Sequence, residues 1–239
     1  RIERLVTYRG CLYAFGSDNT LILKSIDGSS WEPEFPISDR STFMWILDSF
    51  KNQLVIAGSD VYREDFSTSY RDAALHTSID GKLWERVSLD LEALHAIGTS
   101  TSLLGLESSD SELIAHGSSG TIIRAIDLEN WQIISTEMRS ISEVVYDNAF
   151  YAYSSGDIWK SIDGINWSEI GNSPSRLFAK GPAGWVFANI EEDFLKIFLD
   201  ETEFQSPELQ LSVGETGSIK QLSYAGEYYW IIVHGDFSR

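Results

Sequence analysis

One seven-residue segment recurs along this chain. Three copies share Ser, Ile, Asp, Gly and Trp at the same positions, and one copy keeps only the Ile, Asp and Trp. In chain order the copies are turn 1 (Ser25–Trp31), turn 2 (Ser78–Trp84), the reduced turn 3 (Ala125–Trp131) and turn 4 (Ser161–Trp167). A segment that recurs every few tens of residues is the signature of a solenoid, a propeller or a repeat array. This repetition restricts the possible folds more than any other feature of the sequence.

Each copy lies between two short apolar runs. Asp-Gly in such a position predicts a β-hairpin, because the turn requires positive φ and Gly adopts it without steric cost. The Ser and Asp side chains can form hydrogen bonds with backbone groups of the turn. The Trp opens the following strand. We expect its ring to be buried against the neighbouring repeat and its N–H to find an acceptor.

With these residues, the repeat resembles the Asp-box, or BNR repeat, of β-propellers such as sialidases, sortilin-type receptors and photosystem II assembly-factor-like proteins. The chain departs from the family spacing Ser-x-Asp-x-Gly-x-x-Trp, because the residue between Asp and Gly is missing. The resemblance implies an all-β fold, a β-propeller of four-stranded blades braced by these turns. It implies a structural role for Ser25, Asp27, Gly28, Trp31, Ser78, Asp80, Gly81, Trp84, Asp127, Trp131, Ser161, Asp163, Gly164 and Trp167.

The apolar runs divide the chain into about five full blades and a partial sixth. The sixth would contain only the strands 219–224 and 228–234. In the second unit, the insertion between Ala57 and Ala73 is expected to be a surface loop, and residues 90–101 fit no regular element. In the fifth, strand 204–205 is expected to follow a degenerate turn. Residues 1–239 are expected to form a single propeller domain, processed or excised from a longer chain because it starts with Arg1.

The charge balance limits the possible partners. Lys and Arg number 18 against 36 Asp and Glu, which gives a net charge of −18. Such an acidic chain does not fit the phosphate backbone of nucleic acids, which requires a basic patch. No apolar run approaches the roughly 18 residues that a membrane helix needs, and the single Cys11 cannot form an internal disulfide. The family resemblance implies an extracellular, periplasmic or cell-surface location.

A ligand face is expected at the end of the blades opposite the repeated turns. The loops between second and third strands lie there, and they are acidic. The carboxylates that fall in or beside these loops are Asp18, Asp60, Glu64, Asp65, Asp157, Glu191, Glu192, Asp193 and Asp236. Together they could attract a basic partner or a divalent cation. Alternatively, they are scattered loop charges of an acidic protein. No Asp-x-Asp-x-Asp-Gly calcium loop is present, so no metal or cofactor is predicted. His76 and His95 have no partner that the sequence reveals.

Three functions remain open. The sequence favours a noncatalytic binding or scaffold module that presents loops to a protein or glycan partner, since no His-Glu-x-x-His, Gly-x-Ser-x-Gly or phosphate-binding motif is present. The first alternative is a sialidase-like glycoside hydrolase, which would need an arginine cluster, a Tyr nucleophile and an acid/base carboxylate. No spacing singles out such a set. The second alternative is a purely architectural segment of a large surface protein.

Overall fold

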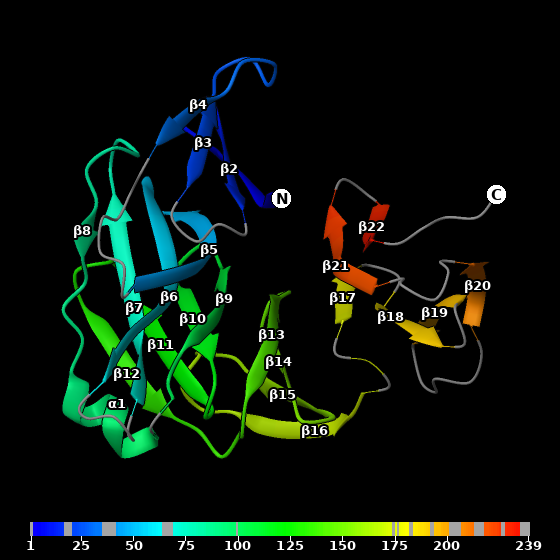
Figure 1. Cartoon of the computed structure of the whole chain (residues 1–239). Helices are drawn as coiled ribbons and strands as arrows, with labels where there is room; N and C mark the ends of the chain where they lie inside the picture. The colour runs from blue at the N-terminus through cyan, green and yellow to red at the C-terminus, as the bar shows by residue number, and fades with distance from the viewer. Residues whose placement is uncertain are drawn as a thin grey trace. The chain divides into compact units, whose positions relative to one another are not determined.

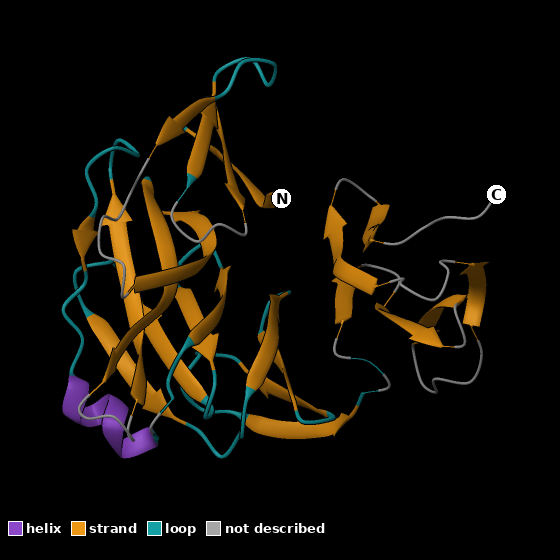
Figure 2. Ribbon diagram, viewed as in Figure 1, coloured by secondary structure: helices purple, strands orange, loops and turns teal. Residues whose placement is uncertain are grey.

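The computed structural model is nearly all β (Figure 2). It describes residues 2–16, 21–34, 42–63, 69–98, 100–173, 175, 177–181, 184–191, 194–200, 207–212, 218–225 and 228–234. Within these ranges the strands form five antiparallel sheets of four strands and one of two strands, each in chain order. The chain divides into two compact units, Arg1–Val144 and Val145–Arg239, and each is described separately below. That the chain forms one domain remains a prediction.

The first unit contains three complete sheets, and Figure 1 labels all of their strands except β1. Sheet 1 consists of β1 (Ile2–Tyr8), β2 (Cys11–Gly16), β3 (Ile22–Ser25) and β4 (Glu32–Glu34). Sheet 2 consists of β5 (Thr42–Phe50), β6 (Gln53–Arg63), β7 (Ser69–Ser78) and β8 (Glu85–Arg86). Sheet 3 consists of β9 (Leu103–Ser108), β10 (Leu113–Gly117), β11 (Thr121–Ala125) and β12 (Trp131–Ser135).

The remaining strands continue the same pattern. Sheet 4 consists of β13 (Ile141–Tyr146), which crosses the division between the units, β14 (Phe150–Ser154), β15 (Asp157–Ser161) and β16 (Ser168–Asn172). Sheet 5 consists of β17 (Leu177–Gly181), β18 (Gly184–Glu191), β19 (Phe194–Asp200) and β20 (Pro207–Ser212). Sheet 6 contains β21 (Ser218–Ala225) and β22 (Tyr228–His234). The strand expected at 204–205 lies outside the described residues.

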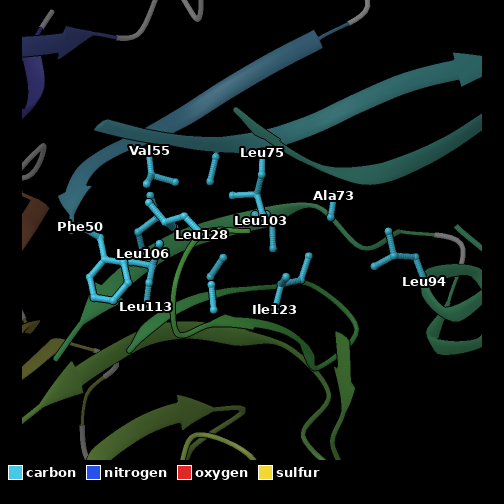
Figure 3. Close-up of a cluster of buried hydrophobic side chains, with 13 residues drawn as sticks. Phe50, Val55, Ala73, Leu75, Leu94, Leu103, Leu106, Leu113, Ile123 and Leu128 are labelled. Carbon is cyan, nitrogen blue, oxygen red and sulfur yellow. The ribbon is translucent and has the colours of Figure 1, made fainter. Parts of the chain in front are cut away.

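Sheet 2 is buried on both faces, which explains its continuous apolar runs. On β6, Val55 and Ala57 belong to the core cluster shared with sheet 3, whereas Leu54 and Ile56 belong to the cluster shared with sheet 1. Alternate residues of a strand point to opposite faces, so a run without polar residues supplies both cores. Figure 3 shows the cluster between sheets 2 and 3, with side chains from Phe50 to Leu128.

The second unit has an aromatic core. Tyr151 of β14, Phe178 of β17 and Phe187 of β18 are buried together. The Trp185 ring packs edge-on against Tyr151 with 4.6 Å between centroids. Edge-to-face geometry places the positive edge of one ring on the negative face of the other. Aromatic side chains therefore hold sheets 4 and 5 together.

Two expectations about irregular segments were wrong. The insertion between Ala57 and Ala73 is mostly a ribbon, because β6 and β7 pair without interruption from Leu54↔Ser78 to Arg63↔Ser69. Pairing satisfies the backbone groups that a loop would leave to solvent. The segment near residue 90 contains the helix α1 (Leu91–Ile97), capped by Asp90, whose side chain accepts a hydrogen bond from the Ala93 amide. The N-cap residue was the signal that the sequence analysis missed.

Across the part of the chain that is described, no helix is both long enough and apolar enough to cross a membrane.

Candidate functional site

One hydrogen-bond pattern holds the repeated turns. In turn 1, Asp27 Oδ1 accepts bonds from the amides two and three residues later, at 2.9 and 2.8 Å. Ser25 Oγ accepts from the Gly28 amide at 2.8 Å, and the Trp31 ring N–H donates to the Gly28 carbonyl at 3.2 Å. The carboxylate contacts recur in turns 2, 3 and 4. In each turn, the Asp carboxylate therefore satisfies two backbone amides of the same turn.

The carboxylates of the turns are stabilised as anions. Hydrogen bonds from turn amides lower the pKa of Asp27, Asp80 and Asp163. For Asp127, the side chain of Asn130 is the first cause and its backbone amide the second. Donors aimed at a carboxylate favour its charged form. These carboxylates are engaged by donors of their own turns, and the structural role expected for them remains a prediction.

Turn 2 is also tied to the neighbouring sheet. The Tyr8 hydroxyl lies 2.8 Å from the Ile79 carbonyl and 2.6 Å from the Asn52 carbonyl. Arg9 donates to the Ile79 carbonyl at 3.0 Å and to Asn52 Oδ1 at 2.9 Å. Trp84 is half-buried against the core of sheets 1 and 2. The expected burial of the Trp ring is thus partial, and polar contacts supply part of the attachment.

The structure describes only some of the acidic loop residues. Asp157 opens β15 and accepts a 2.8 Å bond from Asn172 Nδ2. Glu191 ends β18, where only its backbone is described. Asp60 lies within β6 and is 8% exposed. The other predicted ligand residues lie outside the described ranges: Asp18, Glu64, Asp65, Glu192, Asp193 and Asp236. The acidic face as a whole remains a prediction.

Asp60 belongs to a cluster of charged side chains near the start of β7. Its Oδ1 accepts a 2.6 Å bond from the Thr42 hydroxyl, and its Oδ2 pairs with Arg86 of β8. Asp72 is the register partner of Asp60 on β7 and is 2% exposed. Two carboxylates are therefore buried side by side, at the end of sheet 2 away from turn 2. Such placement requires partners, because an unpaired buried charge is costly.

Two histidines complete this cluster. His95 of α1 has its Nε2 3.1 and 3.2 Å from the two oxygens of Asp72. His76 lies on the same face of β7 as Asp72 and is 8% exposed, and its Nδ1 has no hydrogen-bond partner. Burial, followed by the charge of Arg86, lowers the pKa of His76 to about 4, while Asp60 opposes the shift. We call Asp60, Asp72, His76, Arg86 and His95 the Asp60–Asp72 cluster.

Of this cluster, only Asp60 was predicted from the sequence as a ligand residue, and the sequence revealed no partner for His76 or His95. The other members become neighbours through the register of β6, β7 and β8 and through the position of α1. Recognising β6 and β7 as one long hairpin would have placed Asp72 opposite Asp60. Among the residues that the structure describes, no three or more His, Cys, Asp or Glu side chains are arranged to hold a metal ion.

No family model and no curated protein matches the sequence of this chain. Its fold is similar to that of YCF48 bound to D1 peptide, with 16% identity, a TM-score of 0.66, and coverage of 97% of this chain and 74% of that one. It is also similar to an inactive virginiamycin B lyase from Staphylococcus aureus with quinupristin, with 11% identity, a TM-score of 0.65, and coverage of 95% and 75%. Trypanosoma rangeli sialidase matches with 13% identity, a TM-score of 0.54, and coverage of 99% and 52%.

These neighbours are β-propeller-type proteins. At such low identity the likeness concerns the fold alone, which many unrelated functions share. The four-stranded antiparallel sheets of this chain and its similarity to propellers together give a nearly all-β protein with a propeller-like architecture.

Proposed function

We propose that this chain is an Asp-box β-propeller that works as a noncatalytic binding module for a protein partner. Sheets 1–5 are its full blades, and β21 and β22 begin a sixth. The two ends of sheet 2 differ in a way that supports this proposal. Turn 2 at one end is closed by internal hydrogen bonds. The other end carries the Asp60–Asp72 cluster, which extends to the surface through the side chains of Arg86 and His95.

The observation that carries the proposal is the pair of buried carboxylates in register on β6 and β7. A folding core gains nothing from two like charges directly opposite each other, since such pairs destabilise a sheet. A protein with a net charge of −18 also attracts basic partners at long range. Among its structural neighbours, YCF48 is bound to a peptide. A basic segment of a protein fits these features better than a neutral glycan.

The alternatives differ in what they require. The fold likeness to a sialidase is consistent with glycoside hydrolysis, but this reaction needs residues in defined roles rather than a fold. An architectural segment would need no ligand. The family resemblance of the turns supports a place outside the cytoplasm or at a cell surface for the proposed module.

Affinity capture with mass spectrometry and a glycan array tests the proposal. The protein is compared with an acidic-face variant that carries Asp60, Asp65, Glu191, Glu192 and Asp193 as Asn or Gln. We expect the unaltered protein to capture a protein with a basic segment, and the variant to lose it. A control variant carries Glu85→Gln and Glu129→Gln, which remove exposed charges close to turns 2 and 3.

The control variant should capture the same partner as the unaltered protein. Capture of the partner by both altered proteins would contradict the acidic face as the binding surface. Binding to sialylated glycans together with release of sialic acid from a fluorogenic sialoside would favour the hydrolase. If neither proteins nor glycans are captured, the binding module is wrong and the architectural alternative is favoured.

A further inference from the structure

We propose that the Asp60–Asp72 cluster recognises an arginine side chain of a partner peptide, and that Arg86 occupies this site in the free protein. This inference rests on the proposed binding function and specifies its ligand chemistry. Four features of the protein support it: the positions of the carboxylates, the exposure of Arg86 and His95, the unpartnered His76 nitrogen, and the contrast with a second ion pair of the same unit.

The carboxylates are fixed and lie deep. Asp60 and Asp72 are register partners on neighbouring antiparallel strands, which places their side chains on the same face of the ribbon. Their residues are 8% and 2% exposed. Thr42 holds one oxygen of Asp60 at 2.6 Å. The site therefore presents two anions in a rigid position, and a cation can bind without rearrangement of the backbone.

Arg86 and His95 reach the site from its edge. The Arg86 side chain is 54% exposed although its partner Asp60 is only 11% exposed, and the His95 side chain is 38% exposed against 2% for Asp72. Because an unpaired buried charge is costly, the half-exposed Arg86 can leave for solvent only as another cation takes its place, whereas the buried carboxylates stay fixed. Arg86 also shows that this position accepts a guanidinium, the group whose planar donors match carboxylates.

His76 provides independent evidence for a ligand, because one of its buried ring nitrogens lacks a hydrogen-bond partner. Its Nδ1 is buried and has no hydrogen-bond partner, and the charges of Arg86 and Asp60 shift its pKa in opposite directions. Its residue is 8% exposed, and it shares the face of β7 with Asp72. Since its pKa is about 4, the ring is neutral near pH 7. A guanidinium has five N–H donors, so it can serve a carboxylate and a neutral ring nitrogen together.

A purely structural ion pair in the same unit looks different. Arg124 binds Glu112 through two parallel bonds, from Nε to Oε2 at 2.9 Å and from a terminal nitrogen to Oε1 at 2.8 Å. Both side chains are largely buried, at 11% and 17% exposure. Arg86 contacts Asp60 through one terminal nitrogen and stays half exposed. Arg124 is therefore held in a buried, doubly bonded ion pair, whereas Arg86 forms a singly bonded pair that is accessible to solvent.

Titration by ¹H–¹⁵N NMR with the peptide acetyl-Gly-Arg-Gly-amide tests the proposal. The control peptide carries citrulline, which keeps the shape of arginine without its charge. We expect the arginine peptide to shift the amides of Asp60 and Asp72 and to bind about tenfold more tightly than the citrulline peptide, because a charge-assisted pair is lost. Equal affinity of both peptides would overturn the proposal. Free arginine amide is titrated as well; if it binds more tightly than the tripeptide, the ligand is not a peptide.

Variants test the role of Arg86. Arg86→Gln should tighten binding of the arginine peptide several-fold, because the internal competitor is removed. Lys82→Gln is the matched control, since it removes the same charge from the exposed turn 2 and should leave the affinity unchanged. Equal affinities of these two variants would overturn the occupancy by Arg86. Asp60→Asn should weaken binding about tenfold; if it unfolds, the comparison of Arg86→Gln with Lys82→Gln decides.

These outcomes are separable from the failure of the proposed function. If the full protein captures a partner and Asp60→Asn and Arg86→Gln leave that capture unaltered, the binding module stands and the arginine site is wrong. If no partner is captured, the binding module itself fails, whatever the peptides show.

Discussion

Turn 2 and turn 3 perform the same task with different residues. Turn 2 has Ser78 and Gly81, and the Ser hydroxyl accepts a 2.9 Å bond from the Gly amide. Turn 3 has Ala125 and Leu128 in their places. Leu128 nevertheless adopts φ of 64°, close to the 79° of Gly81. Both turns keep the Asp contacts to two amides and the bond from the Trp ring to the carbonyl of residue 81 or 128.

The difference shows which parts of the motif are indispensable. The Asp and Trp define the conformation, because their hydrogen bonds survive without Ser and Gly. A left-handed conformation costs a residue with a Cβ roughly 1–2 kcal/mol. Leu128 is 7% exposed and belongs to the core between sheets 2 and 3 (Figure 3), so its burial offsets the strain. Turn 3 thus has the core side chain of Leu128 at the position where turn 2 has Gly81.

The largest effect is expected for Leu128→Ala. The variant keeps a Cβ at positive φ and loses the buried side chain, so unfolding free energy should fall by about 2–4 kcal/mol. In Leu128→Gly the unfolding free energy should fall by about 1 kcal/mol less than in Leu128→Ala, because glycine relieves the backbone strain. Urea unfolding followed by Trp fluorescence measures both. A smaller loss for Ala than for Gly would show that Leu128 is not strained.

Replacement of the glycines of turns 1 and 2 by alanine should distinguish backbone strain from a steric clash of the new Cβ. In Gly81→Ala the new Cβ would lie 2.7 Å from Tyr13 Cε1, whereas in Gly28→Ala the nearest atom, Leu12 Cδ1, is 3.4 Å away. Both substitutions add positive-φ strain. We expect losses of about 2–3 kcal/mol for Gly81→Ala and about 1–2 kcal/mol for Gly28→Ala by thermal unfolding.

Gly10→Ala provides the control for strain alone, because φ is 74° and no atom lies within 4 Å of the added Cβ. It should match Gly28→Ala. If Gly81→Ala loses no more stability than these two variants, the Tyr13 ring moves aside freely and does not hold turn 2 in place.

Substitutions at the first position of turns 2 and 3 should change stability less, and by different amounts in the two turns. Ser78→Ala removes the acceptor of the Gly81 amide, and we expect a loss of about 1–2 kcal/mol. Ala125→Ser should change stability by less than about 0.5 kcal/mol, since burial of the hydroxyl cancels any new bond. Chemical denaturation of both variants gives the values. A gain above about 1 kcal/mol in Ala125→Ser would identify the missing serine as the weakness of turn 3.

The smallest effect concerns acid stability. Turn donors lower the pKa of Asp163 and Asp127 in the folded protein, so their stabilisation is present above the unfolded pKa, near 3.9, and is lost as the pH falls below it. Asp163→Asn and Asp127→Asn should therefore destabilise by a constant amount above pH 5 and approach the parent protein below pH 4. Denaturation midpoints between pH 2 and 7 test this. The convergence should be larger for Asp163, and His76 contributes equally to all curves.

The arrangement of sheets was largely predictable, because its signals are local. Each turn places its Asp, its acceptor amides and its Trp within seven consecutive residues, so the motif is complete in the sequence. Short apolar runs between the turns matched most strands, including 228–234. The helix α1 and the β6–β7 ribbon were missed. Helix α1 buries only Leu94, so it has no long apolar periodicity that would reveal it. The ribbon was mistaken for a polar insertion.

The candidate site was predictable only in part. Asp60 was named as one acidic residue among many, and no local pattern predicted its burial. Its neighbours come from β5, β7, β8 and α1 and are placed by the register of long-range strand pairs. Register is a cooperative property of whole strands, and a shift by one residue would move Asp72 to the other face.

The amino-acid sequence by itself determined the repeated turns, the division into short strands and the acidic net charge, since these depend on neighbours in the chain. The tertiary structure alone decided which carboxylates are buried, which cation covers them and which nitrogen remains without a partner. Asp60 and Arg86 are separated by 26 positions and meet only after three strands have paired. Contacts between distant residues depend on the fold, and it is such contacts that form the proposed site.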